Sequence, residues 1–196
     1  MYIARVLYPV EVLGPGKRVG IWFCGCPRRC KSCSNPELWE FQDRYITSPQ
    51  FVYKLVLQIA NHHEIDGFTI TGGEPFYQAE ALQILISHLQ NISDDILVYT
   101  GYTIGELSSE VLNGVSVLID GEYIESRNTD CFLRGSDNQK IHILNPKYKE
   151  KYSSYLAQNV NQTQNFMTSD GVISVGIHKP NFMNDLTTLI SKKGIL

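Results

Sequence analysis

The stretch Gly67-Phe68-Thr69-Ile70-Thr71-Gly72-Gly73-Glu74-Pro75 begins as a strand and ends as a turn. Apolar and β-branched residues fill its first half, and two glycines and a proline then interrupt the pattern. A helix with one buried face is predicted next, from the apolar spacing of Ala79, Leu82, Leu85, Ile86 and Leu89. A strand, a turn and a helix in this order are the unit of an α/β fold with a mainly parallel sheet.

The same alternation extends in both directions from this unit. Further strands are expected at Tyr2–Leu7, Arg18–Phe23, Ile96–Thr100 and Val115–Ile119. Helices are expected from Pro49 to about His62, with Ser48 as N-cap, and near Ile104–Leu112. Internal repeats are absent from the sequence, so we expect a single domain over residues 1–196 with its core at about 1–144.

Residues from about 145 to 196 are expected to extend this core at its C-terminal end. Asn165–Thr168 and Val172–Gly176 flank Ser169-Asp170-Gly171, which predicts a β-hairpin. A final helix is predicted over roughly Asn184–Lys193.

Three cysteines follow the strand expected at Arg18–Phe23, at Cys26, Cys30 and Cys33. A structural zinc site needs four protein ligands, and an ordinary iron–sulfur cluster needs one for each corner iron. Three thiolates from one loop therefore suggest a metal centre with an open position. A zinc knuckle completed by a distant histidine is the alternative. The two other cysteines, Cys24 and Cys131, are expected to be small buried residues.

The turn Gly72-Gly73-Glu74-Pro75 is a second candidate site. Ligands of α/β proteins bind at the carboxyl ends of parallel strands, where this turn is expected to lie. Its glycines allow close approach or positive φ, Glu74 offers a carboxylate that suits an amino group, and Pro75 stiffens the exit. A plain strand-to-helix turn with Glu74 as a capping residue is the alternative. The cysteine triplet upstream favours the functional interpretation.

The composition is ordinary for a soluble globular protein, with 43% hydrophobic and 19% charged residues among 196 and a formal net charge of −3. The sequence shows no basic patch for nucleic acid and no apolar run of the roughly 20 residues that span a bilayer. We therefore expect a cytoplasmic protein with no nucleic-acid or membrane partner, in a reducing compartment that keeps thiolates available for a metal.

With both motifs together, the chain resembles the radical S-adenosylmethionine (SAM) enzymes. That superfamily is marked by Cys-x3-Cys-x2-Cys, matched at Cys26, Cys30 and Cys33, and by a downstream Gly-Gly-Glu-Pro, matched at residues 72–75. The resemblance implies an open or partial (β/α)6 barrel. It also implies that the thiolates hold three irons of a [4Fe-4S] cluster and that the methionyl group of SAM chelates the fourth. In this family the turn at residues 72–75 binds SAM, and Glu74 would help to hold the methionyl amino group.

Further blocks resemble the activating proteins of anaerobic (class III) ribonucleotide reductase. They keep their order over residues 1 to about 144, as Gly14-Pro15-Gly16-Lys17-Arg18, Cys33-Ser34-Asn35-Pro36-Glu37-Leu38-Trp39, Tyr99-Thr100-Gly101-Tyr102-Thr103, Leu118-Ile119-Asp120-Gly121 and Leu133-Arg134-Gly135-Ser136-Asp137-Asn138-Gln139. This likeness implies an enzyme that reductively cleaves SAM to a 5′-deoxyadenosyl radical and installs a glycyl radical on a large partner enzyme. It also implies a flavodoxin- or ferredoxin-like electron donor.

The same resemblance suggests further cofactor-binding positions. Thr100 and Gly101 are candidates to line the nucleoside pocket, and Asp120 to hold a ribose hydroxyl. Arg134 would contact the cofactor or hold a loop in place. Ser32 stands where many radical enzymes carry a bulky residue near the adenine, so contact there is expected through its backbone. Thr100, Gly101 and Asp120 would look the same as ordinary turn residues.

The cysteine loop also carries Arg28, Arg29 and Lys31. These cations could offset the charge of a cluster or meet an acidic partner, or they could be solvated surface charge.

Two other functions stay open on the sequence. A stand-alone radical SAM enzyme could modify a small molecule, nucleotide or peptide handled by the C-terminal extension. A non-catalytic iron–sulfur or zinc module would use the cysteines without any reaction.

Overall fold

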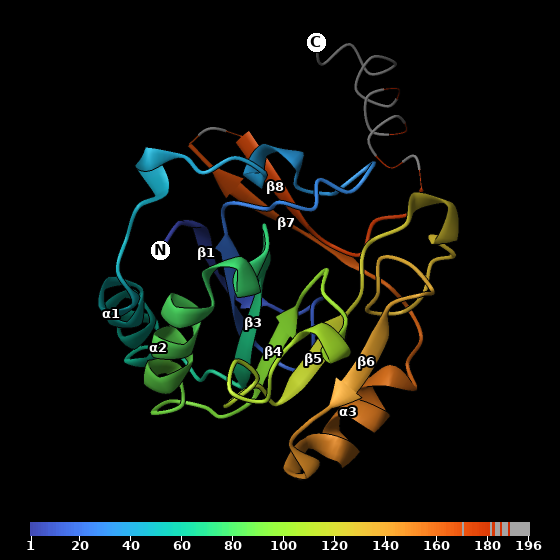
Figure 1. Cartoon of the computed structure of the whole chain (residues 1–196). Coiled ribbons are helices and arrows are strands. Elements are labelled where there is room, and N and C mark those ends of the chain that lie inside the picture. Colours follow the sequence, from blue (N-terminus) through green and yellow to red (C-terminus); the bar gives the residue numbers. More distant parts are fainter. Residues whose placement is uncertain (170, 181, 183–184, 186–187, 189–196) are drawn as a thin grey trace.

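Six strands form one sheet in the computed structural model, which describes residues 1–169, 171–180, 182, 185 and 188. They lie across the sheet in chain order, as β1 (Ile3–Val10), β2 (Arg18–Phe23), β3 (Gly67–Gly72), β4 (Ile96–Tyr99), β5 (Val117–Asp120) and β6 (Lys140–Ile143). β2 to β5 run parallel, and the edge strands β1 and β6 pair antiparallel to their neighbours. The structure is therefore α/β with a mixed sheet (Figure 1), and a partial barrel stays a prediction.

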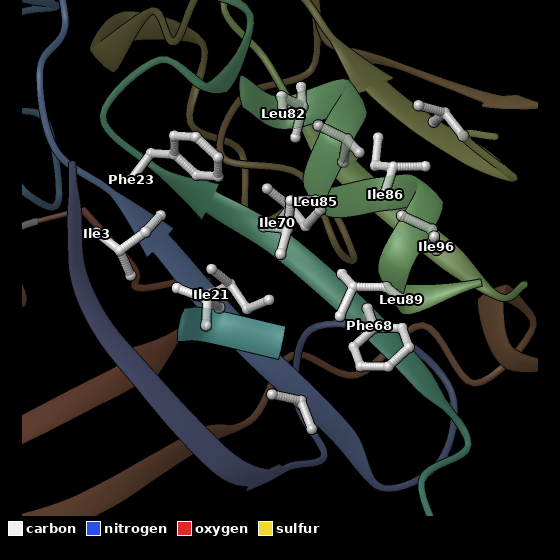
Figure 2. Close-up of a cluster of buried hydrophobic side chains, with 14 of the residues drawn as sticks. Ile3, Ile21, Phe23, Phe68, Ile70, Leu82, Leu85, Ile86, Leu89 and Ile96 are labelled. Atoms are coloured by element: carbon white, nitrogen blue, oxygen red, sulfur yellow. The ribbon is translucent and has the colours of Figure 1, made fainter. Parts of the chain in front are cut away.

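Two helices pack on one face of this sheet. α1 (Pro49–Ala60) begins where the sequence predicts, because the Ser48 side chain accepts a hydrogen bond from the Phe51 N–H at 3.1 Å. α2 (Ala79–Leu89) buries the predicted apolar stripe. Figure 2 shows that stripe over Phe68 and Ile70 of β3, inside the main hydrophobic core.

The other face is covered by a different part of the chain. Successive side chains of a strand point to opposite faces, so Ile96 and Val98 of β4 join the core beneath α1 and α2. Leu97 joins a second cluster with Tyr152 of α3 (Lys149–Leu156). Within the described residues, no helix is both long and apolar enough to cross a membrane.

The predicted hairpin is present as β7 (Thr163–Thr168) and β8 (Gly171–Gly176), which pair antiparallel. Val175 of β8 is buried in a third apolar cluster that contains Leu13, Trp22 and Cys24. Figure 1 shows the hairpin crossing the end of the sheet beside the long loop that follows β2. The hairpin of the C-terminal extension therefore packs at the same end of the molecule as the cysteines, whereas α3 does not.

The predicted helix at Ile104–Leu112 is wrong. One 3-10 turn forms at Ile104–Glu106, and bends and turns follow. Thr103 and Glu106 make a capping box that closes this single turn, and glycine and serine then favour turns over helix. The helix predicted over Asn184–Lys193 lies mostly outside the described residues.

Candidate functional site

One pocket at the carboxyl ends of the parallel strands gathers most of the predicted site. Its walls include Cys26, Cys30 and Cys33 from the loop after β2, and residues 72–74 from the turn after β3. Thr100 and Gly101, directly after β4, also line it. β2, β3 and β4 are parallel neighbours, so the loops at their carboxyl ends meet at one edge of the sheet.

The cysteine loop is a tight turn with its thiols partly buried. Arg29 (φ 49°) and Ser32 (φ 57°) adopt positive φ, and the Cys33 N–H donates to the Cys30 carbonyl at 3.2 Å. Burial, followed by the nearby Glu122 carboxylate and the two other thiols, raises the pKa of Cys30 to about 11. Metal ligands must be thiolates, so metal binding here would release protons.

The donors around the thiols fit an iron–sulfur cluster. Within the described residues, no three His, Cys, Asp or Glu side chains are grouped as ligands of a single metal ion. The thiolates of a cluster bind separate irons and do not need that spacing. Two buried N–H groups of residues lining the pocket, Trp39 Nε1 and Arg28 Nε, have no hydrogen-bond partner in the part of the chain that the structure describes. Sulfur atoms of a cluster accept such hydrogen bonds.

The Trp39 indole lies close to one of the thiols. Burial raises the pKa of Cys33. The Asn35 N–H, which donates to its sulfur at 3.4 Å, opposes that rise, as does the nearby Trp39 indole, although its N–H does not complete a hydrogen bond to the thiol. A donor that favours the thiolate is appropriate beside a metal ligand.

Glu74 is 1% exposed and is held from three sides. Its Oε1 accepts from the Thr100 hydroxyl at 2.8 Å and the Phe76 N–H at 3.1 Å, and its Oε2 accepts from the Gly101 N–H at 2.8 Å. Burial raises the pKa of Glu74, and these donors and the Arg28 charge only partly offset it. The carboxylate thus has uncharged donors but no ion-pair partner among the described residues, since Arg28 pairs with Glu106 instead, at 3.5 Å.

The two glycines of the turn allow close packing of the protein against itself. A Cβ on Gly72, whose φ is 105°, would lie 2.4 Å from the Phe23 carbonyl oxygen, and a Cβ on Gly73 would lie 2.5 Å from that of Gly25. The N–H groups of Gly73 and Glu74 donate to these same carbonyls at 2.7 and 2.9 Å. The turn is therefore attached to the start of the cysteine loop, which places Glu74 in the same pocket as the thiols.

Four other predicted cofactor-binding residues lie outside the pocket wall. Pro75 is buried at the start of a 3-10 helix. Asp120 is also buried, accepts from the Ile104 N–H at 2.7 Å and lies 3.1 Å from His142 Nε2. Arg134 donates to the Gln139 carbonyl at 3.0 Å, and Ser32 hydrogen-bonds Glu125 in a neighbouring groove. Their direct contact with a cofactor stays a prediction.

The cations of the cysteine loop are paired within the chain. Arg28 pairs with Glu106 and lies over the Tyr102 ring at 4.3 Å. Arg29 pairs with Glu40, and Lys31 pairs with Glu125 at 3.1 Å. These contacts favour internal neutralisation over the recognition of an acidic partner.

Several pocket residues were missed by the sequence analysis. They include Trp39, which stood in a family block without an assigned role, Tyr123, and a run from the C-terminal extension, Ser174 to His178. Ser174 Oγ lies 2.9 Å from His178 Nε2, and burial lowers the pKa of His178. The extension carries no motif, so only its fold brings these residues to the thiols.

The two remaining cysteines differ from each other. Cys24 is fully buried, as predicted. Cys131 is only partly buried, with its sulfur 3.0 Å from the Thr129 hydroxyl, so its predicted place in the core is wrong. The Phe132 and Leu133 side chains that follow it fill that cluster instead.

Comparison with known proteins identifies the core of the chain. A family model described as "4Fe-4S single cluster domain" matches residues 12–142. The anaerobic ribonucleoside-triphosphate reductase-activating protein of Enterobacteria phage T4 is 33% identical over 141 residues, which cover 69% of this chain and 90% of that protein. The protein of the same name from Escherichia coli (strain K12) is 30% identical over 152 residues, covering 70% and 96%.

A more distant relative has a different named target. The pyruvate formate-lyase-activating enzyme of Clostridium pasteurianum is 26% identical over 132 residues, covering 64% of this chain and 56% of that enzyme. The family model ends before α3 and the hairpin, so the extension lies outside it. The match over residues 12–142, which include the cysteine loop, the turn after β3 and strands β2 to β5, and the likeness to these relatives show that this chain belongs to the 4Fe-4S single cluster domain family and, within it, to the anaerobic ribonucleoside-triphosphate reductase-activating proteins.

Proposed function

We propose that this protein binds a [4Fe-4S] cluster and SAM and installs a glycyl radical on an anaerobic ribonucleotide reductase. The observation that carries the proposal is the single pocket that Cys26, Cys30 and Cys33 share with Glu74. Relatives named as activators of that reductase and of pyruvate formate-lyase support a glycyl radical enzyme as partner.

Each part of the pocket has a role in this proposal. The three thiolates would hold the cluster, and the Trp39 indole would donate to one of its sulfurs. When bound, the cluster and SAM would supply the redox chemistry, a one-electron cleavage of a C–S bond of SAM that allows a hydrogen atom to be taken from a glycine Cα. Glu74 would accept hydrogen bonds from the methionyl amino group, which supplies the cation that this carboxylate lacks.

The surroundings of the pocket complete the proposal. The six-stranded sheet would form the partial barrel that holds SAM across its strand ends. A flavodoxin- or ferredoxin-like protein would reduce the cluster, and a reducing cytoplasm would keep the thiols available.

The test uses anaerobically reconstituted protein with dithionite, SAM and the anaerobic reductase from the same genome. Wild type should bind iron and sulfide, release 5′-deoxyadenosine and produce a glycyl doublet on the reductase in electron paramagnetic resonance. Cys30→Ala should lose all three, whereas the matched control Cys131→Ala, outside the pocket, should keep them.

Two results would contradict the proposal. Equal release of 5′-deoxyadenosine by Cys30→Ala would remove the cluster from the reaction. Release by wild type without any reductase radical would leave SAM cleavage intact and show that the hydrogen donor is a different molecule.

A further inference from the structure

A second hollow adjoins the pocket and opens beside the hairpin. It is lined by residues 32–37 of the cysteine loop, by Tyr123, Glu125 and Asn128, and by Val172 to Ser174 of β8 with the segment that follows. The residues lining both hollows are Cys33, Ser34, Asn35, Tyr123, Ser174 and His178. The groove is thus continuous with the thiol pocket.

β8 presents an unpaired edge to this groove. β8 lines both hollows and β7 lines neither, and β8 pairs with β7 alone. Thr168 and Gly171 face each other across the turn, so they form the first hydrogen-bonded pair. Because pairs alternate in an antiparallel ladder, the N–H and C=O groups of Val172 and Ser174 point away from β7. Among the described residues, no other strand pairs with this edge.

The hairpin is fixed in place by contacts with the core. The Gln164 side chain donates to the Pro9 carbonyl at 2.8 Å and accepts from the Glu11 N–H at 3.1 Å. Val175 is 3% exposed among core residues, and the Asn128 side chain donates to the His178 carbonyl at 3.2 Å. The hairpin is therefore held in a fixed position, with Val172 to Ser174 of β8 along the groove.

We propose that the glycine-bearing segment of the partner enzyme enters this groove as an extended strand and pairs with the outer edge of β8. This inference rests on the proposed function and names the docking element for its protein substrate. The C-terminal extension, which the family model does not include, then acts as the specificity element of this chain.

The shape of the site favours a peptide over a small molecule. β8 has six residues, and at about 3.3 Å each its edge is about 20 Å long. A row of outward N–H and C=O groups of that length suits the main chain of an extended peptide, which then needs no particular side chains to bind. The continuity of the groove with the thiol pocket would bring such a segment to the reacting atoms.

The test compares two proline variants on opposite edges of the hairpin. Val172→Pro removes an outward N–H on the groove side, and Met167→Pro removes the outward N–H of its cross-strand partner on the other edge. Both side chains are exposed, 59% for Val172 and 81% for Met167. Val172→Pro should raise the Kd of the holoenzyme for the reductase about three- to ten-fold, the value of one lost hydrogen bond, and Met167→Pro should leave it unchanged. Thermal unfolding of both variants identifies any loss that comes from a melted hairpin.

Hydrogen exchange on the wild-type holoenzyme provides a second readout that needs no variant. Addition of the reductase should slow exchange at the amides of Val172 and Ser174, and leave those of Asn165 and Met167 unchanged. A wild type that forms the reductase radical without slowed exchange on β8, and with equal Kd for both variants, overturns the docking inference alone. Slowed exchange on β8 without any radical supports docking while the proposed function fails.

Discussion

Two buried carboxylates, Asp95 and Glu74, lie at opposite ends of the parallel strands, and their pKa values are shifted in opposite directions. Asp95 precedes β4 at its amino end, where its Oδ1 accepts from Arg18 at 3.1 Å and from the Tyr152 hydroxyl at 2.7 Å. Its Oδ2 accepts from Lys151 at 2.6 Å. Burial acts to raise the pKa of Asp95, but Arg18 and the other donors outweigh it and lower the pKa overall.

Glu74, at the carboxyl end, has only uncharged donors, and burial keeps its pKa raised. The protein therefore neutralises the buried carboxylate at the amino end with its own cations, Arg18 and Lys151. At the carboxyl end, beside the thiols, it leaves Glu74 without an ion-pair partner among the described residues. This difference supports a structural role for Asp95 and the proposal that Glu74 binds a ligand.

The largest expected effect is on the stability of the protein, from a substitution of Asp95 at the amino end of the strands. Asp95→Asn would leave the fully buried Arg18 guanidinium without its counter-charge. Breaking a buried pair on one side costs about 3–5 kcal/mol, so the urea midpoint of the reconstituted protein should fall accordingly. A midpoint close to that of wild type would show that the carbonyls that Arg18 also contacts hold it adequately. It would contradict a structural role for Asp95.

The second largest effect is expected on the binding of SAM, from a substitution of Glu74 at the carboxyl end of the strands. Glu74→Gln keeps the shape of the side chain but removes the charge, so the affinity for SAM should fall by roughly ten- to a hundred-fold, as for a lost charge-assisted hydrogen bond. Anaerobic equilibrium dialysis with labelled SAM measures this. Thr100→Val, which removes one uncharged donor to Glu74, is the control and should weaken binding less. Unchanged affinity in Glu74→Gln would show that this carboxylate only braces the turn.

The two carboxylates should also give opposite pH dependences of stability. The folded pKa of Asp95 is lowered, so its contribution is complete above its unfolded pKa of about 4 and is lost as pH falls through the folded value. The folded pKa of Glu74 is raised, so its ionised form costs stability at higher pH, and that cost disappears as pH falls toward about 4.3.

Urea midpoints measured against pH, without SAM, test these slopes. Asp95→Asn should flatten the loss of stability in acid, and Glu74→Gln should remove a decline that appears as pH rises above about 4.3. Parallel curves for wild type and both variants would contradict the opposite assignments.

The smallest effect is expected one residue away from Asp95. Asp94 is partly exposed and pairs with the exposed Lys147 at 2.8 Å. Exposed pairs contribute little, so Asp94→Asn should leave the urea midpoint almost unchanged. Asp94→Asn is the matched control for Asp95→Asn. If both substitutions lowered the midpoint equally, the loss in Asp95→Asn would not come from its buried ion pair.

Elements whose signals are local were predicted well. The strand at Arg18–Phe23 coincides with β2, and the helix capped by Ser48 begins where expected. The three cysteines and Glu74, which their motifs single out, share a pocket, and their roles as ligands stay predictions. These features follow from periodicity, capping and spacing, which neighbouring residues determine.

The misses depend on contacts between distant segments. The segment after Thr103 forms a single turn in place of a helix, and Cys131 lies outside the core. Arg18 and Asp95 are 77 positions apart, and no local sequence pattern predicts that they pair. The part of the pocket wall formed by residues 174–178 could not be predicted either, because the extension carries no motif.

The sequence by itself determined the chemistry available to this protein: three thiols in one short loop, a glycine turn with a carboxylate, and the alternation that makes a parallel sheet. Only the tertiary structure decided that Glu74 has no ion-pair partner among the described residues while Asp95 has two, and that β8 lines the same pocket as the thiols. The reason is physical. Local spacing sets which groups a segment carries, whereas burial, charge pairing and shared cavities arise only when segments far apart in the chain pack together.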